Sequence, residues 1–134
     1  MTKLFSICLF LLLLPALAYA EDKAEVFIAK PDVHGLQRVE ISGGSYNFKP
    51  NHIVVKKDLP VELILKNESL LIAHSFVIDE PDAGMEYNAE MTGTNIAMFI
   101  PRKTGKYKFY CDRKFFFSKS HRQKGMEGTI EVVE

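Results

Sequence analysis

Four side chains of this sequence are of the types that bind a soft metal ion. Cys111, His121 and Met126 follow one another along a single stretch near the C-terminal end, and His74 lies upstream in an apolar segment. A thiolate, two imidazoles and a thioether are the donors of a mononuclear blue-copper site, where sulfur suits Cu(I) and imidazole suits Cu(II). The set predicts a site that tolerates both oxidation states of copper, and hence electron transfer or copper handling.

Residues 1–20 have the pattern of a cleaved signal peptide. Lys3 precedes the apolar run 4–14, and Ala18-Tyr19-Ala20 has the small-x-small pattern of a cleavage site. The apolar run is too short to span a bilayer comfortably. We therefore expect residues 21–134 to be one exported, periplasmic domain without a membrane span.

Removal of the signal peptide would take away Cys8 and leave Cys111 as the single cysteine. Exported proteins ordinarily form disulfides, so a lone thiol indicates burial, an intermolecular bridge or a metal. The closeness of His121 and Met126 in the sequence favours a metal. Structural alternatives stay open: His74 as a hydrogen-bonded strand histidine, His121 as a surface residue, Cys111 and Met126 as core residues.

The net charge of the chain says little about its function, whereas the local distribution of charge is informative. The chain has 17 basic and 17 acidic residues, so its net charge favours no particular partner. Basic residues concentrate between 102 and 124, around the predicted metal loop, where they are either a solvated face or an attraction for an acidic partner. A basic set confined to one loop of an exported protein does not indicate nucleic-acid binding.

Four protein ligands would leave no open coordination position on the metal, so we expect no enzymatic activity.

Alternation of apolar and polar residues dominates the chain after the signal peptide. Turn residues separate short strand patterns at roughly 8–12-residue spacing, which is typical of a sandwich. Residues 85–94 could be a short helix or an irregular segment. We expect an all-β fold, a Greek-key β-sandwich of seven to eight strands in antiparallel pairs, with strands at 25–29, 37–41, 53–56, 61–66, 74–78, 95–100, 106–111 and 128–133.

Four segments resemble the cupredoxins, the small blue-copper proteins: Tyr46-Asn-Phe48 with Pro50, His74-Ser-Phe76, Phe109-Tyr-Cys111, and Gly125-Met126 with Gly128-Thr-Ile130. They are similar to the family's early strands, first histidine segment, approach to the cysteine, and ending. The resemblance implies the cupredoxin-like sandwich and single-electron transport. It also implies one copper ion (Cu+/Cu2+) per chain, with a weak axial thioether, on His74, Cys111, His121 and Met126.

One departure from the resemblance concerns the ligand loop. Nine residues, Asp112 to Ser120, separate Cys111 from His121, whereas plastocyanin-like members have only a few there. The insertion contains Phe115-Phe116-Phe117, of which we expect at least one ring to pack on the sandwich end. An apolar patch beside a solvent-facing edge of His121 would suit docking of a cytochrome, an oxidase or a copper enzyme.

Two further functions stay open at this point. The alternative to electron transport is a copper-binding protein for trafficking or resistance, which delivers or sequesters copper, and a third is a metal-free interaction module. Among the remaining methionines, Met98 is predicted to be core, while Met85 and Met91 are only loosely placed. His34 and His52 are predicted to be surface residues rather than ligands.

Overall fold

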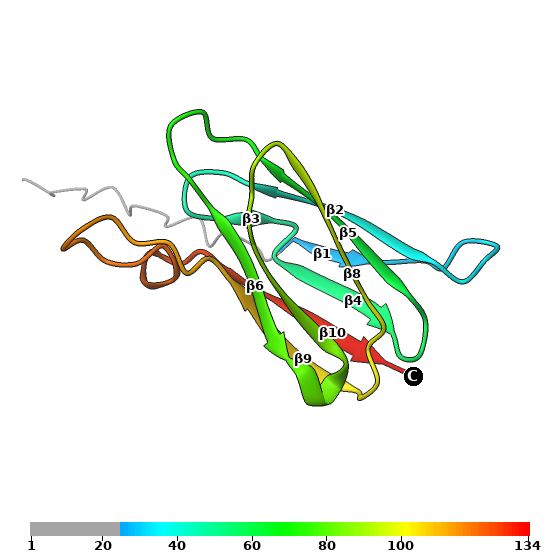
Figure 1. Ribbon diagram of the computed structural model, residues 1–134. Coiled ribbons are helices and arrows are strands. Elements are labelled where there is room, and N and C mark those ends of the chain that lie inside the picture. Colours follow the sequence, from blue (N-terminus) through cyan, green and yellow to red (C-terminus); the bar gives the residue numbers. More distant parts are fainter. Residues whose placement is uncertain (1–24) are drawn as a thin grey trace, which may run out of the picture.

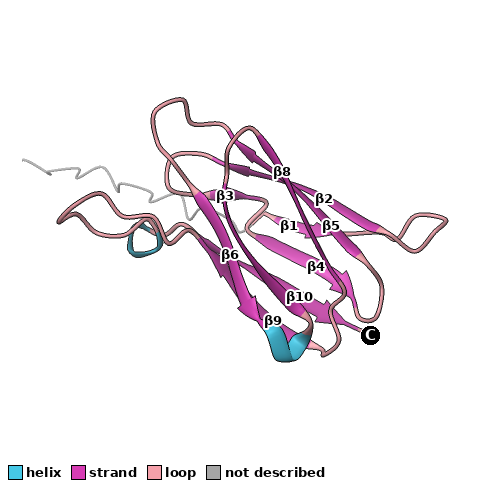
Figure 2. Cartoon of the chain, viewed as in Figure 1, coloured by secondary structure: helices cyan, strands magenta, loops and turns pink. Residues whose placement is uncertain are grey.

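Two β-sheets packed face to face form the protein in the computed structural model, which describes residues 25–134 (Figure 1). The larger sheet has the order β1 (Val26–Ile28), β4 (His52–Lys56), β10 (Glu127–Val133), β9 (Gly105–Tyr110), β6 (Ser75–Glu80) and β7 (Met85–Glu90). The smaller sheet has the order β3 (Phe48–Lys49), β2 (Gln37–Gly43), β5 (Val61–Asn67) and β8 (Thr94–Phe99). Single 3-10 turns are η1 (Pro81–Ala83) and η2 (Arg122–Lys124) (Figure 2).

The alternation in the sequence becomes burial on one face of each sheet. Gln37–Gly43 and Val61–Asn67 place every second residue in the core, and Glu127–Val133 does the same from the opposite sheet. Side chains of a strand alternate between its two faces, so this pattern buries one face and leaves the other for solvent. The prediction of an all-β sandwich is confirmed.

Three details differ from the sequence prediction. The described residues form ten strands rather than seven or eight: the additional two are β3, which at two residues is too short to show an alternation, and β7. Residues 85–90 are a strand, not a helix: they pair with β6 along their whole length, from Met85 opposite Glu80 to Glu90 opposite Ser75. Three pairs, β1–β4, β4–β10 and β2–β5, are parallel, because the chain crosses between the sheets at most connections.

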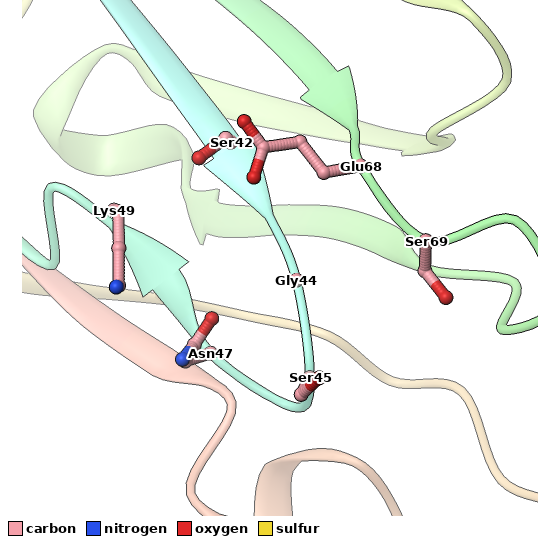
Figure 3. Close-up of a pocket in the computed structure, with 7 residues that line it drawn as sticks. All are labelled: Ser42, Gly44, Ser45, Asn47, Lys49, Glu68 and Ser69. Carbon is pink, nitrogen blue, oxygen red and sulfur yellow. The ribbon is translucent and has the colours of Figure 1, made fainter.

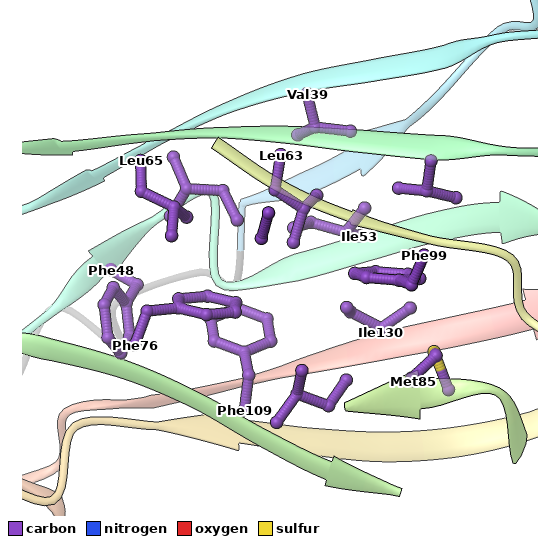
Figure 4. Packing of buried hydrophobic residues seen from close by; sticks show 14 of the residues in the cluster. Val39, Phe48, Ile53, Leu63, Leu65, Phe76, Met85, Phe99, Phe109 and Ile130 are labelled. Atoms are coloured by element: carbon purple, nitrogen blue, oxygen red, sulfur yellow. The ribbon is translucent and has the colours of Figure 1, made fainter. Parts of the chain in front are cut away.

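Three phenylalanines make the centre of the core near the end that carries the candidate ligands. Phe76 and Phe109 stack with ring centroids 5.0 Å apart, and Phe48 meets Phe109 edge to face at 5.3 Å (Figure 4). Each is buried to within 1% of full burial. Since one comes from the smaller sheet and two from the larger, this cluster joins the sheets and fixes the strands from which the ligands extend.

Gly128 lies where the backbone of β10 approaches this cluster. A Cβ there would overlap the ring of Phe109 and lie 2.6 Å from the backbone oxygen of Asn51, which already accepts a hydrogen bond from the Thr129 N–H. We expect Gly128→Ala to lower the free energy of unfolding by about 1–3 kcal/mol, as overpacked cores do. Urea denaturation measures this. Thr129→Ala, at the next, half-buried position, should cost less than about 1 kcal/mol; equal losses would contradict the prediction.

The predicted signal peptide, residues 1–20, lies outside the described residues. Within 25–134, no helix has the length and apolar character needed to cross a membrane.

Candidate metal centre

Strand register brings His74 and Cys111 together at one end of the sandwich. His74 immediately precedes β6 and Cys111 immediately follows β9, and these strands are antiparallel neighbours with Val77 opposite Tyr110. The Cys111 N–H donates to the carbonyl of Met126 at 3.1 Å, which extends the pairing of β9 with β10 by one step. Rigid strands therefore hold two candidate ligands, and the loop before β10 supplies the others.

The donor atoms of His74, Cys111 and His121 converge on one point. The two Nδ1 atoms lie 3.3 Å apart, and the Cys111 Sγ lies 3.4 Å from the Nδ1 of His121 and 4.0 Å from that of His74. All three donors fall within 4.8 Å of one another and all three residues are buried. A thiol and two imidazoles on one small volume fit copper, which binds both donor types.

Burial keeps both imidazoles in the form that binds metal. Desolvation lowers the pKa of His74, with the Gly44 backbone opposing the shift. Desolvation also lowers the pKa of His121, and the charges of His74, Lys124 and Arg113 lower it further. Neutral histidine has a free lone pair on the nitrogen that carries no hydrogen, so the site is ready to accept a cation near pH 7.

These lowered pKa values predict how acid affects the metal-free protein. Below about pH 6.5, the ordinary histidine value, the unfolded chain binds protons that the folded chain does not. We therefore expect the free energy of unfolding to fall between pH 7 and 5.5, by at most about 1.4 kcal/mol per pH unit for each histidine. Urea titrations across this range measure it, and His121→Gln should flatten the profile whereas the exposed-site variant His34→Gln should not. A flat profile in the unchanged protein would be the contrary result.

Ser75, which the sequence analysis did not single out as a site residue, contacts the thiol. Its N–H donates to the Cys111 Sγ at 3.3 Å, and its hydroxyl lies 3.5 Å from the same sulfur but 2.5 Å from the Asp112 carboxylate. The Asp112 N–H donates back to the Ser75 oxygen at 3.0 Å. The Ser75 hydroxyl has one proton, which bonds more strongly to the Asp112 carboxylate than to the Cys111 sulfur. The hydrogen bond to the sulfur therefore comes from the backbone N–H of Ser75.

Met126 is fully buried, and its N–H donates to the carbonyl of His121 at 3.0 Å. Its methyl group and that of Met91 flank Gly43, where an added Cβ would lie 3.3 Å from one and 3.2 Å from the other.

Met91 and Met85 are both buried rather than loosely placed. Met98, predicted to be core, is 59% exposed because it lies on the outer face of β8. As for the two predicted surface histidines, His34 is exposed and His52 is part-buried against Glu131.

The ligand loop is long but closed at its base. The His121 N–H donates to the carbonyl of Arg113 at 2.8 Å, and Arg113 forms an ion pair with Glu90 on β7. Beyond this closure, residues 114–120 extend away from the sandwich, in orange in Figure 1. The expectation that one ring of Phe115-Phe116-Phe117 packs on the sandwich end is wrong: they are 69%, 77% and 104% exposed, because the closure directs the tip outward.

The edge of His121 does not face solvent as expected. The residue is only 5% exposed, and the ring of Tyr46 meets it edge to face with centroids 4.8 Å apart. A cleft of about 300 Å³ opens beside the two rings, between the loops that carry Leu71–Ala73 and Arg113–Phe115. The sequence offered no signal for this cover, because Tyr46 lies far from the ligands along the chain.

Comparison with known proteins agrees with the fold. The family model described as "Cupredoxin-like domain" matches residues 4–132. The chain is 28% identical over 101 residues to quinol oxidase subunit 2 of Sulfolobus acidocaldarius; the match covers 75% of this chain and 56% of that protein, so the chain spans just over half the length of this relative.

Solved structures that share the fold include the following two. One is the metal-binding domain of the Cu(I) exporting P-type ATPase CopA of Streptococcus pneumoniae D39, with 20% identity, a TM-score of 0.60, and coverage of 83% of this chain and 98% of that one. The other is auracyanin of Roseiflexus castenholzii, with 17% identity, a TM-score of 0.57, and coverage of 72% and 97%.

The match over nearly the whole chain settles the family, and the converging thiol and imidazoles supply the donors that copper requires. The protein takes one copper per chain. The resemblance inferred from the sequence is confirmed: this chain belongs to the cupredoxin-like domain family.

Proposed function

We propose that this protein is an exported, periplasmic carrier of single electrons. The observation that supports this most strongly is the buried convergence of His74, Cys111 and His121. We assign these three as copper ligands and the buried Met126 as the weak fourth ligand. Copper, when bound, supplies the one-electron chemistry. The chain itself holds the donors on strands and a closed loop, which limits rearrangement between oxidation states.

Four buried protein donors support a carrier rather than an enzyme. A catalytic metal site keeps a position open for substrate. Here the donors lie at most 5% exposed, which leaves an outside molecule little access to the ion. Transfer of an electron needs close approach of a partner but no bond to the metal, so burial is compatible with it.

We propose that the redox partner docks on the loops beside His121. Phe115–Phe117, Leu70 and Leu71 are exposed apolar side chains on two loops, and Leu71 and Phe115 line the same cleft beside His121. Lys114 and Lys119 flank the phenylalanines in the sequence. Exposed apolar groups gathered in this way indicate an interaction site, and the lysines favour an acidic rim on the partner. We propose a cytochrome, an oxidase or a copper enzyme as the partner, and the similarity to an oxidase subunit favours the second.

Copper handling is the second candidate, favoured by the shared fold with the metal-binding domain of a Cu(I) exporting ATPase. The two functions differ in which species crosses the surface. A carrier exchanges electrons and keeps its copper, whereas a trafficking protein gives its copper away.

Voltammetry of the copper-loaded full chain tests the proposal. We expect a reversible one-electron couple, and copper retention over minutes in an excess of the Cu(I) chelator bathocuproine disulfonate. Rapid copper loss without a reversible couple would reject the carrier and favour copper handling. Failure to bind one copper per chain would reject both.

A further inference from the structure

Tyr46 covers the copper site from outside the sandwich. Its ring lies 4.8 Å from that of His121 and 6.4 Å from that of His74, edge to face in both cases. His121 is consequently 5% exposed, although it belongs to a loop. We propose that Tyr46 closes the site: it shields His121 from water and competing ligands, so that copper stays bound while electrons pass. This inference rests on the proposed function and names the residue that makes retention possible.

The backbone of Tyr46 is held in an unfavourable conformation. Tyr46 has a φ of 60° in the tight turn between β2 and β3, a left-handed conformation that bulky residues rarely adopt. Figure 3 shows this turn with Gly44, Ser45 and Asn47 labelled. The Gly44 N–H donates to the carbonyl of Asn47 at 3.1 Å, and the Tyr46 N–H donates to the carbonyl of Gly44 at 2.9 Å. Such strain persists where the surroundings fix it and is concentrated at ligand clamps. A glycine would form the turn more easily, so the contacts of the tyrosine ring, rather than the turn, account for a tyrosine at this position.

A lysine from the ligand loop holds the same ring. The Lys124 Nζ lies 4.1 Å from the centroid of Tyr46, within the range of a cation–π contact. Lys124 belongs to η2, between His121 and Met126. The β2–β3 turn and the ligand loop are thus joined across the site. Tyr46 also lines the cleft with Leu71 and Phe115, so a partner entering there reaches the tyrosine ring beside the imidazole.

Two variants separate the ring from the backbone. Tyr46→Gly removes the cover and readily adopts the positive φ, so the turn should be kept. Tyr46→Phe keeps the ring. In the Cu(I)-loaded full chain mixed with excess bathocuproine disulfonate, we expect Tyr46→Gly to release copper about tenfold faster, equivalent to about 1.4 kcal/mol, the upper range of an aromatic pair. Tyr46→Phe should stay within about twofold of the unchanged chain; equal rates for Tyr46→Gly and the unchanged chain would overturn the proposal.

A second readout does not need copper. Diethylpyrocarbonate modifies accessible neutral imidazoles, and peptide mass spectrometry separates His121 from the exposed His34, which serves as the internal reference. In the metal-free chain, His121 should be modified faster relative to His34 in Tyr46→Gly but not in Tyr46→Phe. An unchanged ratio in Tyr46→Gly would overturn the cover. A chain that failed to bind copper would count against the proposed function alone, since this readout would still decide the role of Tyr46.

Discussion

Replacing Cys111 by alanine should abolish the intense visible absorption of the copper-loaded protein. A copper–thiolate bond is the origin of that absorption in blue-copper sites, and within residues 25–134 Cys111 is the only cysteine. Its Sγ lies within 4.0 Å of the Nδ1 atoms of both histidines, which places it to bind the same ion as they do. Titration of the full chain with Cu(II) should saturate the band at one copper per chain and show no band in the variant.

Cys8→Ala is the matched control, because it removes the other cysteine of the sequence by the same substitution. It should leave the band and the stoichiometry unchanged. A band that survives Cys111→Ala, or that disappears with Cys8→Ala, would show that Cys111 is not the copper thiolate. The position of the band in the unchanged protein would also report whether Met126 acts as a weak axial ligand.

Replacing Phe109 by alanine should cause the largest loss of stability among single substitutions in the core. Phe109 is fully buried, stacks on Phe76 at 5.0 Å and meets Phe48 at 5.3 Å. Truncation of a buried phenylalanine to alanine costs about 3–5 kcal/mol, through lost burial and the cavity left behind. Urea denaturation of the metal-free protein should show this loss, and copper affinity should fall as well, since Phe109 lies two residues before Cys111.

Phe117→Ala makes the same chemical change at a fully exposed position. It should alter the free energy of unfolding by less than about 0.5 kcal/mol, as surface substitutions do. A large loss in Phe117→Ala would mean that the ligand-loop tip packs on the sandwich after all. A small loss in Phe109→Ala would mean that the three-phenylalanine cluster does not hold the two sheets together.

Local pattern was sufficient to predict the long strands and to select candidate ligands, three of which, His74, Cys111 and His121, the fold brings together. Segments such as Gln37–Gly43 and Glu127–Val133 alternate cleanly because one face is buried. The candidate ligands were recognisable because thiol, imidazole and thioether are uncommon together on one loop. Residues 85–90 do alternate, with Met85, Tyr87 and Ala89 as the less exposed positions of β7. They were ambiguous because methionine, glutamate and alanine are also good helix formers.

Features that depend on contacts between distant segments could not be predicted in the same way. Ser75 reaches the thiol only because β6 and β9 are neighbours, and Tyr46 reaches His121 only through the turn between β2 and β3. Met98 was assigned to the core from its apolar character, although in its strand the alternate positions, Ala97 and Phe99, are the buried ones. In each case the register of one strand on another, rather than composition, decides the environment.

The hydrogen bond from the His121 N–H to the Arg113 carbonyl closes the base of the ligand loop, so the tip could be replaced by another sequence without changing the base. This hydrogen bond joins His121 to a residue only two positions after Cys111, so a short stretch of chain connects the two candidate ligands. Residues 114–120 lie outside that connection. Grafting a different tip onto the same base should change which partner the protein recognises without altering its reduction potential. On the proposed function, partner recognition and metal binding depend on separate stretches of the same loop, so each can change in evolution without the other.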